Sequence, residues 1–393
     1  MLSRRRLISA ILLGSLGPSL SALAQPTANP ATKTPPKAAP VAPDAVAPVK
    51  PAAGPQPMRF GSGPATIALL IPPRDGPFGR VGNGVLAGVR ASHSRDGDGV
   101  AVEVIETDTA PEVLGRVFAD LRERGVALVM GPLTRDGVNS LVTLDRVPGL
   151  PTLALNLPDG ALPARSQIAF FGLSIEAESR QVAVIAFDQV RGAIARRAPR
   201  AVAVADASRF AQRSAIAFRD EWAARGGEID EPIEFNAKRP AQGFREALKD
   251  ANPDVVFLAM SPEQARSARQ SIDSRVRLWS SSAASIGQSR LLRLPKLNGL
   301  RVLDMPWQVE PDHPAVMAYP KAPTAYTVEM QRFYALGIDA FRVGRQIMAG
   351  SAAFELDGVT GHLSYDPMVG PRVERMPVIA EYRDGMPVVV TSR

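Results

Sequence analysis

From residue 65 onward, the apolar positions follow two alternating patterns. Short continuous or alternating apolar runs, as in ATIALLIP (65–72) and VALVMGPL (126–133), are typical of buried strands. Between these runs the apolar positions recur every three to four residues, as at Val85 and Val89, which indicates helices with one buried face. The alternation predicts strand–helix units, and right-handed crossovers then give a parallel sheet with helices on both faces.

The same alternation occurs a second time between residues 176 and 283, with runs such as DVVFLAMS (254–261). After it, 297–309 is predicted to be extended and 324–349 to form a long helix. We therefore predict an α/β protein with two doubly wound parallel sheets joined by a multi-strand hinge, the arrangement of the bilobal periplasmic-binding-protein type I fold. The predicted lobes are about 65–173 with 305–350, and about 174–304 with 351–393.

The N-terminus carries the pattern of an export signal. Three arginines precede an apolar stretch at 7–16, and small residues stand at Ala22 and Ala24, which predicts a signal peptide over 1–24 that is cleaved after Ala24. Export through either the Sec or the twin-arginine route fits this pattern, so we expect a periplasmic protein. An uncleaved N-terminal membrane anchor is the alternative, but the run is short and is broken by glycine and proline, which favours cleavage. No later run is apolar enough for a transmembrane segment in the mature chain.

Residues 25–64 hold 11 of the 36 prolines, together with many alanines. Proline removes backbone donors and fixes φ, so this segment is predicted to be a disordered, extended linker. The net charge of +7 also belongs to this end of the chain, because residues 1–64 contain seven cations and one acid, whereas 65–393 contain 39 basic and 38 acidic residues. We therefore expect no nucleic-acid partner.

Several kinds of chemistry are not expected. The chain has no cysteine, which excludes disulfides, thiolate catalysis and lipidation of a cysteine. Its three histidines are far apart, without metal-ligand spacing. It shows neither a G-x-S-x-G elbow nor a Walker A loop. We predict a protein that is not an enzyme and that holds no cofactor or metal.

Ligands of open α/β sheets bind beyond the carboxyl ends of the strands. Applied to the predicted strands, this rule selects six polar residues as candidates for a cleft that takes a small-molecule ligand. Thr134 and Asn156 fit an alternative role as caps of loop backbone. The candidates are Asp75, Thr134, Asn156, Asp206, Ser208 and Ser261.

Asp339 lies in the middle of the apolar helix FYALGIDAFRVGRQI (333–347). Burying an unpaired carboxylate costs several kcal/mol, so Asp339 is either a functional group or a structural one. Apolar residues surround most of the helix, which favours a structural role: acceptance of hydrogen bonds from a neighbouring loop or an arginine.

Seven segments, in family order, carry a resemblance that covers most of residues 65–393. They are VMGPLTRDGVNSL (129–141), PTLALN (151–156), FFGLSIEAESR (170–180), DVVFLAMSPEQAR (254–266), LNGLRVLDMPW (297–307), FYALGIDAF (333–341) and GVTGHLS (358–364). This ordered set resembles the C-terminal domain of the LppC/LpoA family, the penicillin-binding protein activators. The resemblance implies a two-lobed periplasmic-binding-type domain that regulates peptidoglycan synthesis by contact with a bifunctional penicillin-binding protein or another envelope protein, without catalysis. It also implies a lipid anchor and a preceding helical-repeat domain in the founding members, neither of which we expect here.

Two interpretations of the fold stay open. The alternative to an activator is a soluble substrate-binding protein for amino acids or similar small solutes of an ABC transporter, which requires an open cleft between the lobes. An activator requires an exposed apolar or aromatic patch for its partner. The aromatic candidates for such a patch are Trp307, Tyr319 and Tyr326, for which packing at the hinge is the alternative role.

Overall fold

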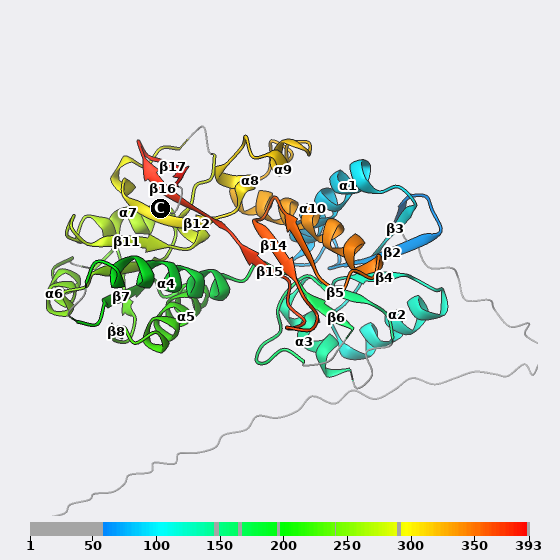
Figure 1. Cartoon of the computed structure of the whole chain (residues 1–393), viewed down its shortest axis with the longest axis horizontal. Helices are drawn as coiled ribbons and strands as arrows, with labels where there is room; N and C mark the ends of the chain where they lie inside the picture. Colours follow the sequence, from blue (N-terminus) through cyan, green and yellow to red (C-terminus); the bar gives the residue numbers. More distant parts are fainter. Residues whose placement is uncertain are drawn as a thin grey trace, which may run out of the picture. The chain divides into compact units, whose positions relative to one another are not determined.

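The computed structural model describes residues 58–144, 149–163, 167–194, 197–239, 241–288 and 292–390 (Figure 1). All of them belong to one compact unit of the chain, Pro55–Arg393. The predicted signal peptide at 1–24 and the predicted linker as far as residue 57 lie outside the described residues. None of the described helices is long and apolar enough to cross a membrane.

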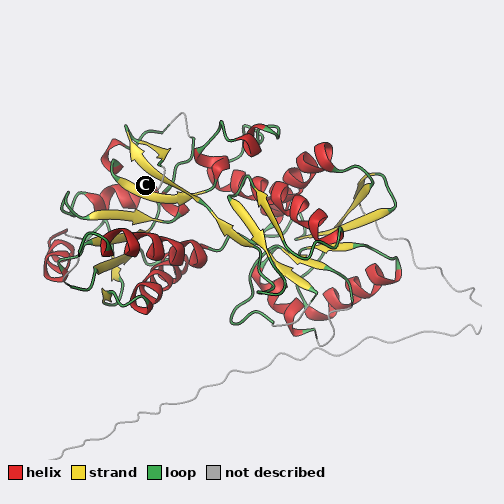
Figure 2. Ribbon diagram, viewed as in Figure 1, coloured by secondary structure: helices red, strands yellow, loops and turns green. Residues whose placement is uncertain are grey.

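The first sheet has six strands in the order β1-β3-β2-β4-β5-β6, all parallel except β1 at one edge. Helices α1 and α10 pack on one face and α2 and α3 on the other (Figure 2). The elements are β1 (Met58–Gly61), β2 (Ala65–Ile71), β3 (Val100–Glu106), β4 (Leu128–Met130), β5 (Thr152–Ala154), β6 (Ile168–Phe170), α1 (Gly79–Asp96), α2 (Pro111–Glu123), α3 (Arg135–Thr143) and α10 (Val328–Met348).

The second sheet has the order β17-β16-β12-β11-β10-β7-β8, with β9 also paired to β7. Strands β7 to β12 are parallel, and β16 and β17 add an antiparallel edge. The elements are α4 (Ile175–Arg191), β7 (Arg200–Ala205), α5 (Arg209–Ala224), β8 (Glu228–Ile229), β9 (Ile233–Glu234), α6 (Ala241–Ala251), β10 (Val255–Ala259), α7 (Pro262–Arg269), β11 (Arg277–Ser280), η1 (Ser282–Ala284), η2 (Pro295–Leu297), β12 (Leu300–Asp304), β16 (Val378–Arg383) and β17 (Met386–Val389).

Both sheets show the predicted doubly wound topology: β2 lies between β3 and β4 in the first sheet, and β7 lies between β8 and β10 in the second. The chain passes between the lobes at 171–174, after β12 and before β16, so the hinge contains three crossings. Two short helices, α8 (Pro306–Val309) and α9 (Pro314–Met317), follow the second crossing. The predicted bilobal α/β fold is confirmed.

The N-terminal boundary of the folded part differs from the prediction. The linker was expected to continue to residue 64, but Met58–Gly61 forms strand β1, antiparallel to β3. Met58 and Phe60 alternate with more exposed residues and pack against the core of the first sheet. This period of two is a strand signal that the nearby prolines and glycines hide.

The lobe boundary near residue 351 also differs. Strands β13 (Phe354–Asp357), β14 (His362–Tyr365) and β15 (Glu374–Met376) form a separate antiparallel sheet. Leu363 of β14 and Val373, which directly precedes β15, belong to the core of the first lobe. Only β16 and β17 join the second sheet, so the second lobe resumes at about residue 378 rather than at 351.

Candidate functional site

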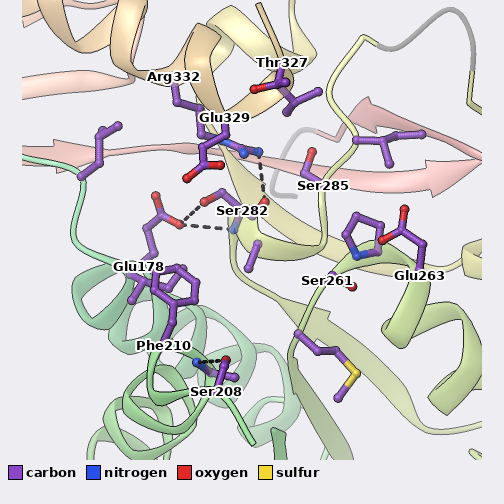
Figure 3. A pocket seen from close by; sticks show the side chains of 18 of the residues that line it. Glu178, Ser208, Phe210, Ser261, Glu263, Ser282, Ser285, Thr327, Glu329 and Arg332 are labelled. Atoms are coloured by element: carbon purple, nitrogen blue, oxygen red, sulfur yellow. Dashed lines mark hydrogen bonds between the residues drawn. The ribbon is translucent and has the colours of Figure 1, made fainter. Parts of the chain in front are cut away.

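A cavity of about 680 Å³ lies at the carboxyl ends of the strands of the second sheet (Figure 3). Asp206 follows β7, Ser261 follows β10, Ser282 follows β11 and Met305 follows β12, and all four line the cavity. The first turn of α10, from the other lobe, forms the remaining wall through Glu329 and its neighbours. The cavity therefore occupies the position at which open α/β sheets bind ligands.

The walls of the cavity are mostly apolar. Phe210 is 49% exposed, an unusual state for a phenylalanine, and borders the opening. Such walls take up an apolar group and leave a few polar groups to orient it. The larger apolar lining residues are Leu173, Ile175, Phe210, Met260, Ile286, Leu292, Met305, Val328 and Phe333.

Three helices begin at the cavity, each with a capping hydroxyl. Ser208 Oγ accepts a hydrogen bond from the Ala211 N–H (3.2 Å) at the start of α5. Ser261 caps α7 and Thr327 caps α10 in the same way. A hydroxyl that accepts in this way still carries one hydrogen, so these groups can donate to a ligand as well as hold their helices.

Carboxylates accompany these helix N-termini. Glu263 and Glu329 lie in the first turns of α7 and α10, and Asp206 Oδ1 accepts from the Ser208 N–H at 2.8 Å. Acids at these positions complement the positive ends of the helix dipoles. The positive helix ends and the negative carboxylates oppose each other. The apolar walls therefore determine which ligand fits the cavity more than a net charge does.

The floor of the cavity contains a buried ion pair. Glu178 is 4% exposed and contacts Arg375 Nη2 at 2.5 Å. Its other oxygen accepts from Ser282 Oγ (2.7 Å) and from the Ser282 N–H (3.2 Å), which is visible in Figure 3. Both carboxylate oxygens therefore have partners, and the carboxylate is held rather than free to act on a ligand.

Arg332 of α10 extends into the same region. It donates to Asp304 Oδ2 and to the Ser282 carbonyl, both at 3.0 Å. Burial opposes its charge, but Asp304 more than compensates, so the pKa of Arg332 lies above its ordinary value. The pair joins α10 of the first lobe to the end of β12 in the second.

Asp339 lies one to two turns further along α10 and is completely buried. Its carboxylate accepts hydrogen bonds from the Val359 N–H (3.1 Å), the Thr360 N–H (2.7 Å), the Thr360 hydroxyl (2.7 Å) and Arg342 (3.1 Å). Burial raises the pKa of Asp339 in spite of these donors. The donors are thus a neighbouring loop and an arginine, as expected from the sequence. The structural role of Asp339 stays a prediction.

The polar groups form one continuous network across the hinge. The Thr360 carbonyl, next to Asp339, accepts from Arg375 Nη1 at 3.1 Å. Arg375 contacts Glu178, which contacts Ser282. The Ser282 carbonyl accepts from Arg332, whose guanidinium reaches Asp304. We call this chain of contacts the hinge network; it contains Asp339, Thr360, Arg375, Glu178, Ser282, Arg332 and Asp304.

The sequence-based cleft candidates divide into two groups. Asp206, Ser208 and Ser261 line the cavity, whereas Asp75, Thr134 and Asn156 are not among its lining residues. Thr134 Oγ1 accepts from the Gly137 N–H at the start of α3, and Asn156 Nδ2 donates to the Leu133 carbonyl. Asp75 is exposed in the loop before α1.

Two of the three aromatic candidates for a partner patch are buried, and the third, Tyr326, is half-buried. Trp307 and Tyr319 are each 8% exposed and lie in one apolar cluster with Tyr334 of α10, against which Tyr326 also packs. Tyr319 additionally donates to Asp96 Oδ2 at 3.0 Å. Trp307 and Tyr319 thus expose too little surface to anchor a partner, and the alternative of packing near the hinge describes them better.

A second ion-pair cluster joins the two lobes at the first crossing. Glu176, in the first turn of α4, contacts Arg135 of α3 (3.2 Å) and Arg213 of α5 (2.9 Å). Burial raises the pKa of Glu176, but a backbone N–H, the two arginines and Ser174 outweigh it and hold the pKa below the ordinary value. Arg135 directly follows Thr134, so the cap on α3 positions a residue that reaches the other lobe.

Sequence reasoning missed Glu178, Arg332, Arg375 and Arg135. Each lies on a helix or strand whose apolar pattern predicts burial, and a charged residue on a buried face was a signal that could have been used. Their partners could not be found in this way, because Glu178 and Arg375 are separated by 197 positions in the chain.

The fold and the cavity define a bilobal α/β protein of the periplasmic-binding-protein type. Residues 58–385 match the family described as LppC putative lipoprotein, and the chain belongs to this family. One relative, the penicillin-binding protein activator LpoA of Enterobacter sp. (strain 638), is 24% identical over 302 residues. That match covers 65% of this chain and 40% of the relative, so the chain spans less than half of that protein's length.

Two solved structures share the fold. The C-domain of LpoA (YraM) from Haemophilus influenzae, described as a regulator of PBP1A, has a TM-score of 0.67 and 22% identity, covering 83% of this chain and all of that one. A putative branched-chain amino acid ABC transporter protein from Chromobacterium violaceum has a TM-score of 0.66 and 31% identity, covering 81% of this chain and 99% of that one. Activator-type and transporter-type proteins thus both share this architecture.

Proposed function

We propose that this chain is a non-catalytic protein of the bacterial envelope that regulates peptidoglycan synthesis by binding a bifunctional penicillin-binding protein. The observation that carries the proposal is the family match over 58–385, together with the name of activator that the curated relatives bear. The export signal predicted at 1–24 supports a periplasmic location, through either the Sec or the twin-arginine route.

The buried charged groups of the cavity are held by partners rather than free for acid–base chemistry. A general acid or base needs a carboxylate that is free to exchange a proton with a ligand. Glu178 instead accepts from Arg375 and Ser282, and Arg332 is paired with Asp304. Among the described residues, no group of three or more histidines, aspartates or glutamates could hold a metal ion.

The cavity favours one second candidate, a solute receptor. Its volume of about 680 Å³ is sufficient for a small organic molecule, and the Chromobacterium violaceum protein bears a transporter name. The apolar walls favour a solute with an apolar body over a free polar amino acid.

Two binding measurements on the full chain separate the candidates. The first measures the affinity for each bifunctional penicillin-binding protein of the same organism, and the second screens amino acids, aromatic acids and muropeptide fragments by thermal denaturation. A ligand at a hundred times its dissociation constant adds about 2.7 kcal/mol to the free energy of unfolding. Saturable binding to a synthase without a thermal shift supports the activator. A thermal shift from one solute without synthase binding would replace it with the receptor.

A further inference from the structure

Two of the most exposed large apolar side chains of the described residues are neighbours in the chain. Met368 is 91% exposed and Val369 is 87% exposed, in the turn between β14 and β15 (Figure 1). Single exposed apolar residues are common on protein surfaces. Two adjacent ones at the end of a hairpin form a projecting apolar group, which we call the apolar tip.

The apolar tip is held in a fixed conformation. Asp366 Oδ1 accepts from the Met368 N–H at 2.8 Å, and the Asp366 carbonyl accepts from the Val369 and Gly370 N–H groups at 3.0 Å each. Beyond the turn, the chain is hydrogen-bonded to β6. The Phe170 N–H donates to the Pro371 carbonyl (2.8 Å), and the Phe170 carbonyl accepts from the Val373 N–H (2.9 Å). Because the tip is already ordered, little conformational entropy is lost when a partner binds it, which favours binding.

The sheet that carries the tip has an acidic outer face. Along β13, Phe354 and Leu356 pack on the core while Glu355 and Asp357 point outward. On β14 and β15 the exposed residues are His362, Glu374 and Met376, and Met376 is 55% exposed. The outer face therefore combines carboxylates with a third exposed apolar side chain.

Basic residues of the same segment do not neutralise this face. Arg375 is 7% exposed and engaged by Glu178, so its charge is directed into the hinge. Arg372 lies 3.4 Å from Glu374. Glu355 and Asp357 lie near the histidines His362 (3.6 Å) and His313 (3.5 Å), which carry a charge only when protonated. When these imidazoles are neutral, the carboxylates of Glu355, Asp357 and Asp366 give the outer face of the sheet and its turn an acidic character.

From this combination we propose that the outer face of the β13–β14–β15 sheet and the apolar tip form a docking surface for a folded protein that offers an apolar pocket bordered by basic groups. An acidic border repels an anionic lipid surface and attracts a basic protein surface, so the charges favour a protein over a membrane. That this protein is the penicillin-binding protein rests on the proposed function.

The test places a photocrosslinking amino acid at Val369 of the full chain in cells of the native organism. The control position is Ile216, which is 39% exposed on α5 of the second lobe. The expected result is an adduct with a bifunctional penicillin-binding protein from position 369 and none from position 216. The double variant M368S/V369S should bind this protein at least about tenfold more weakly, because buried apolar anchors dominate such interfaces. The variant E355K/E374K should weaken binding and reduce its salt dependence.

The two proposals can fail separately. Normal synthase binding by both variants, with no adduct from position 369, would overturn the docking surface and leave the activator function standing. An adduct from position 369 with an identified basic protein other than a synthase, abolished by E355K/E374K, would uphold the surface and overturn the synthase as its partner. Adducts with lipid only would overturn the docking surface.

Discussion

Four donors converge on the carboxylate of Asp339, and this arrangement illustrates how single residues support the fold. Oδ1 accepts from Arg342 of α10 and from the Val359 N–H, and Oδ2 accepts from the N–H and the hydroxyl of Thr360. The surrounding apolar pattern allowed the burial of Asp339 to be predicted from the sequence. The identity of the donors could not be predicted, because the loop reaches Asp339 only through the tertiary fold.

Replacing Asp339 with asparagine should destabilise the protein by about 2 kcal/mol, because one amide oxygen cannot accept all four hydrogen bonds. Thermal denaturation of D339N measures the loss, and D312N, the same type of change at an exposed position, serves as the control. Partner affinity of the folded D339N protein should equal that of the wild type. A variant of normal stability that has lost only its binding would show that Asp339 acts in recognition.

The buried pair of Glu178 and Arg375 should be strongly coupled. Removing Glu178 alone, as in E178Q, leaves a buried arginine without its counter-charge and should cost about 3–5 kcal/mol of stability. The double variant E178L/R375M removes both charges and should be more stable than the sum of the single changes predicts. A double-mutant cycle measures this coupling. Strictly additive single effects would show that the two side chains do not depend on each other.

At the level of elements, helices α1 and α10 approach each other at two glycines. A Cβ atom on Gly88 would lie 1.9 Å from the Tyr334 carbonyl oxygen, and one on Gly337 would lie 2.1 Å from that of Val85. Both glycines are visible in the sequence. The sequence does not show that the two helices approach each other at these glycines, because more than 200 residues separate the helices in the chain.

The substitution G88A should therefore destabilise the protein by about 3 kcal/mol or more, because backbone atoms of α10 would have to move. The matched control is G243A on α6, where an added Cβ meets no atom within 4 Å. There alanine should be neutral or stabilising by up to about 1 kcal/mol, since it favours helix over glycine. Equal unfolding temperatures for the two variants would contradict the close approach.

The contacts of Glu176 should make the stability of the protein depend on pH. Since the pKa of Glu176 in the folded protein lies below its ordinary value of 4.5, the stabilisation by Glu176 is complete above about pH 4.5 and is lost as the pH falls through the folded pKa. The variant E176Q should therefore lose less stability than the wild type between pH 4.5 and pH 3, as followed by urea denaturation. If the stabilities of E176Q and the wild type fell equally between pH 4.5 and pH 3, the ion pairs with Arg135 and Arg213 would contribute nothing to the stability of the protein.

Element prediction from the sequence succeeded where the pattern is local. The parallel strands and their helices were predicted because long apolar runs and helical spacing identify them individually. Strand β1 was missed because its four residues follow a proline-rich stretch, and β13–β15 were assigned to the wrong lobe. The lobe of a short antiparallel strand depends on distant partners, here Leu363 and Val373 against the first core.

For the whole molecule, the topology places a cavity at one edge of the second sheet and a network of buried charges beneath it. Three of the six candidate cleft residues line that cavity because the strand-end rule depends only on topology. The other three also follow strand ends, but in the first lobe, where the residues that follow β2, β4 and β5 do not line the cavity. Which lobe supplies a cavity depends on side-chain packing, which a single sequence does not reveal.

The proposed contact with a cell-wall synthase predicts an effect of the whole molecule on the rate of peptidoglycan synthesis. The most direct test titrates the full chain into a purified bifunctional penicillin-binding protein of the same organism and follows glycan polymerisation and peptide cross-linking. We expect a saturable rise in at least one of the two rates, and a smaller rise with M368S/V369S than with a surface control such as I216S. Unchanged rates of glycan polymerisation and peptide cross-linking, at chain concentrations far above that of the synthase, would contradict the proposed activator function.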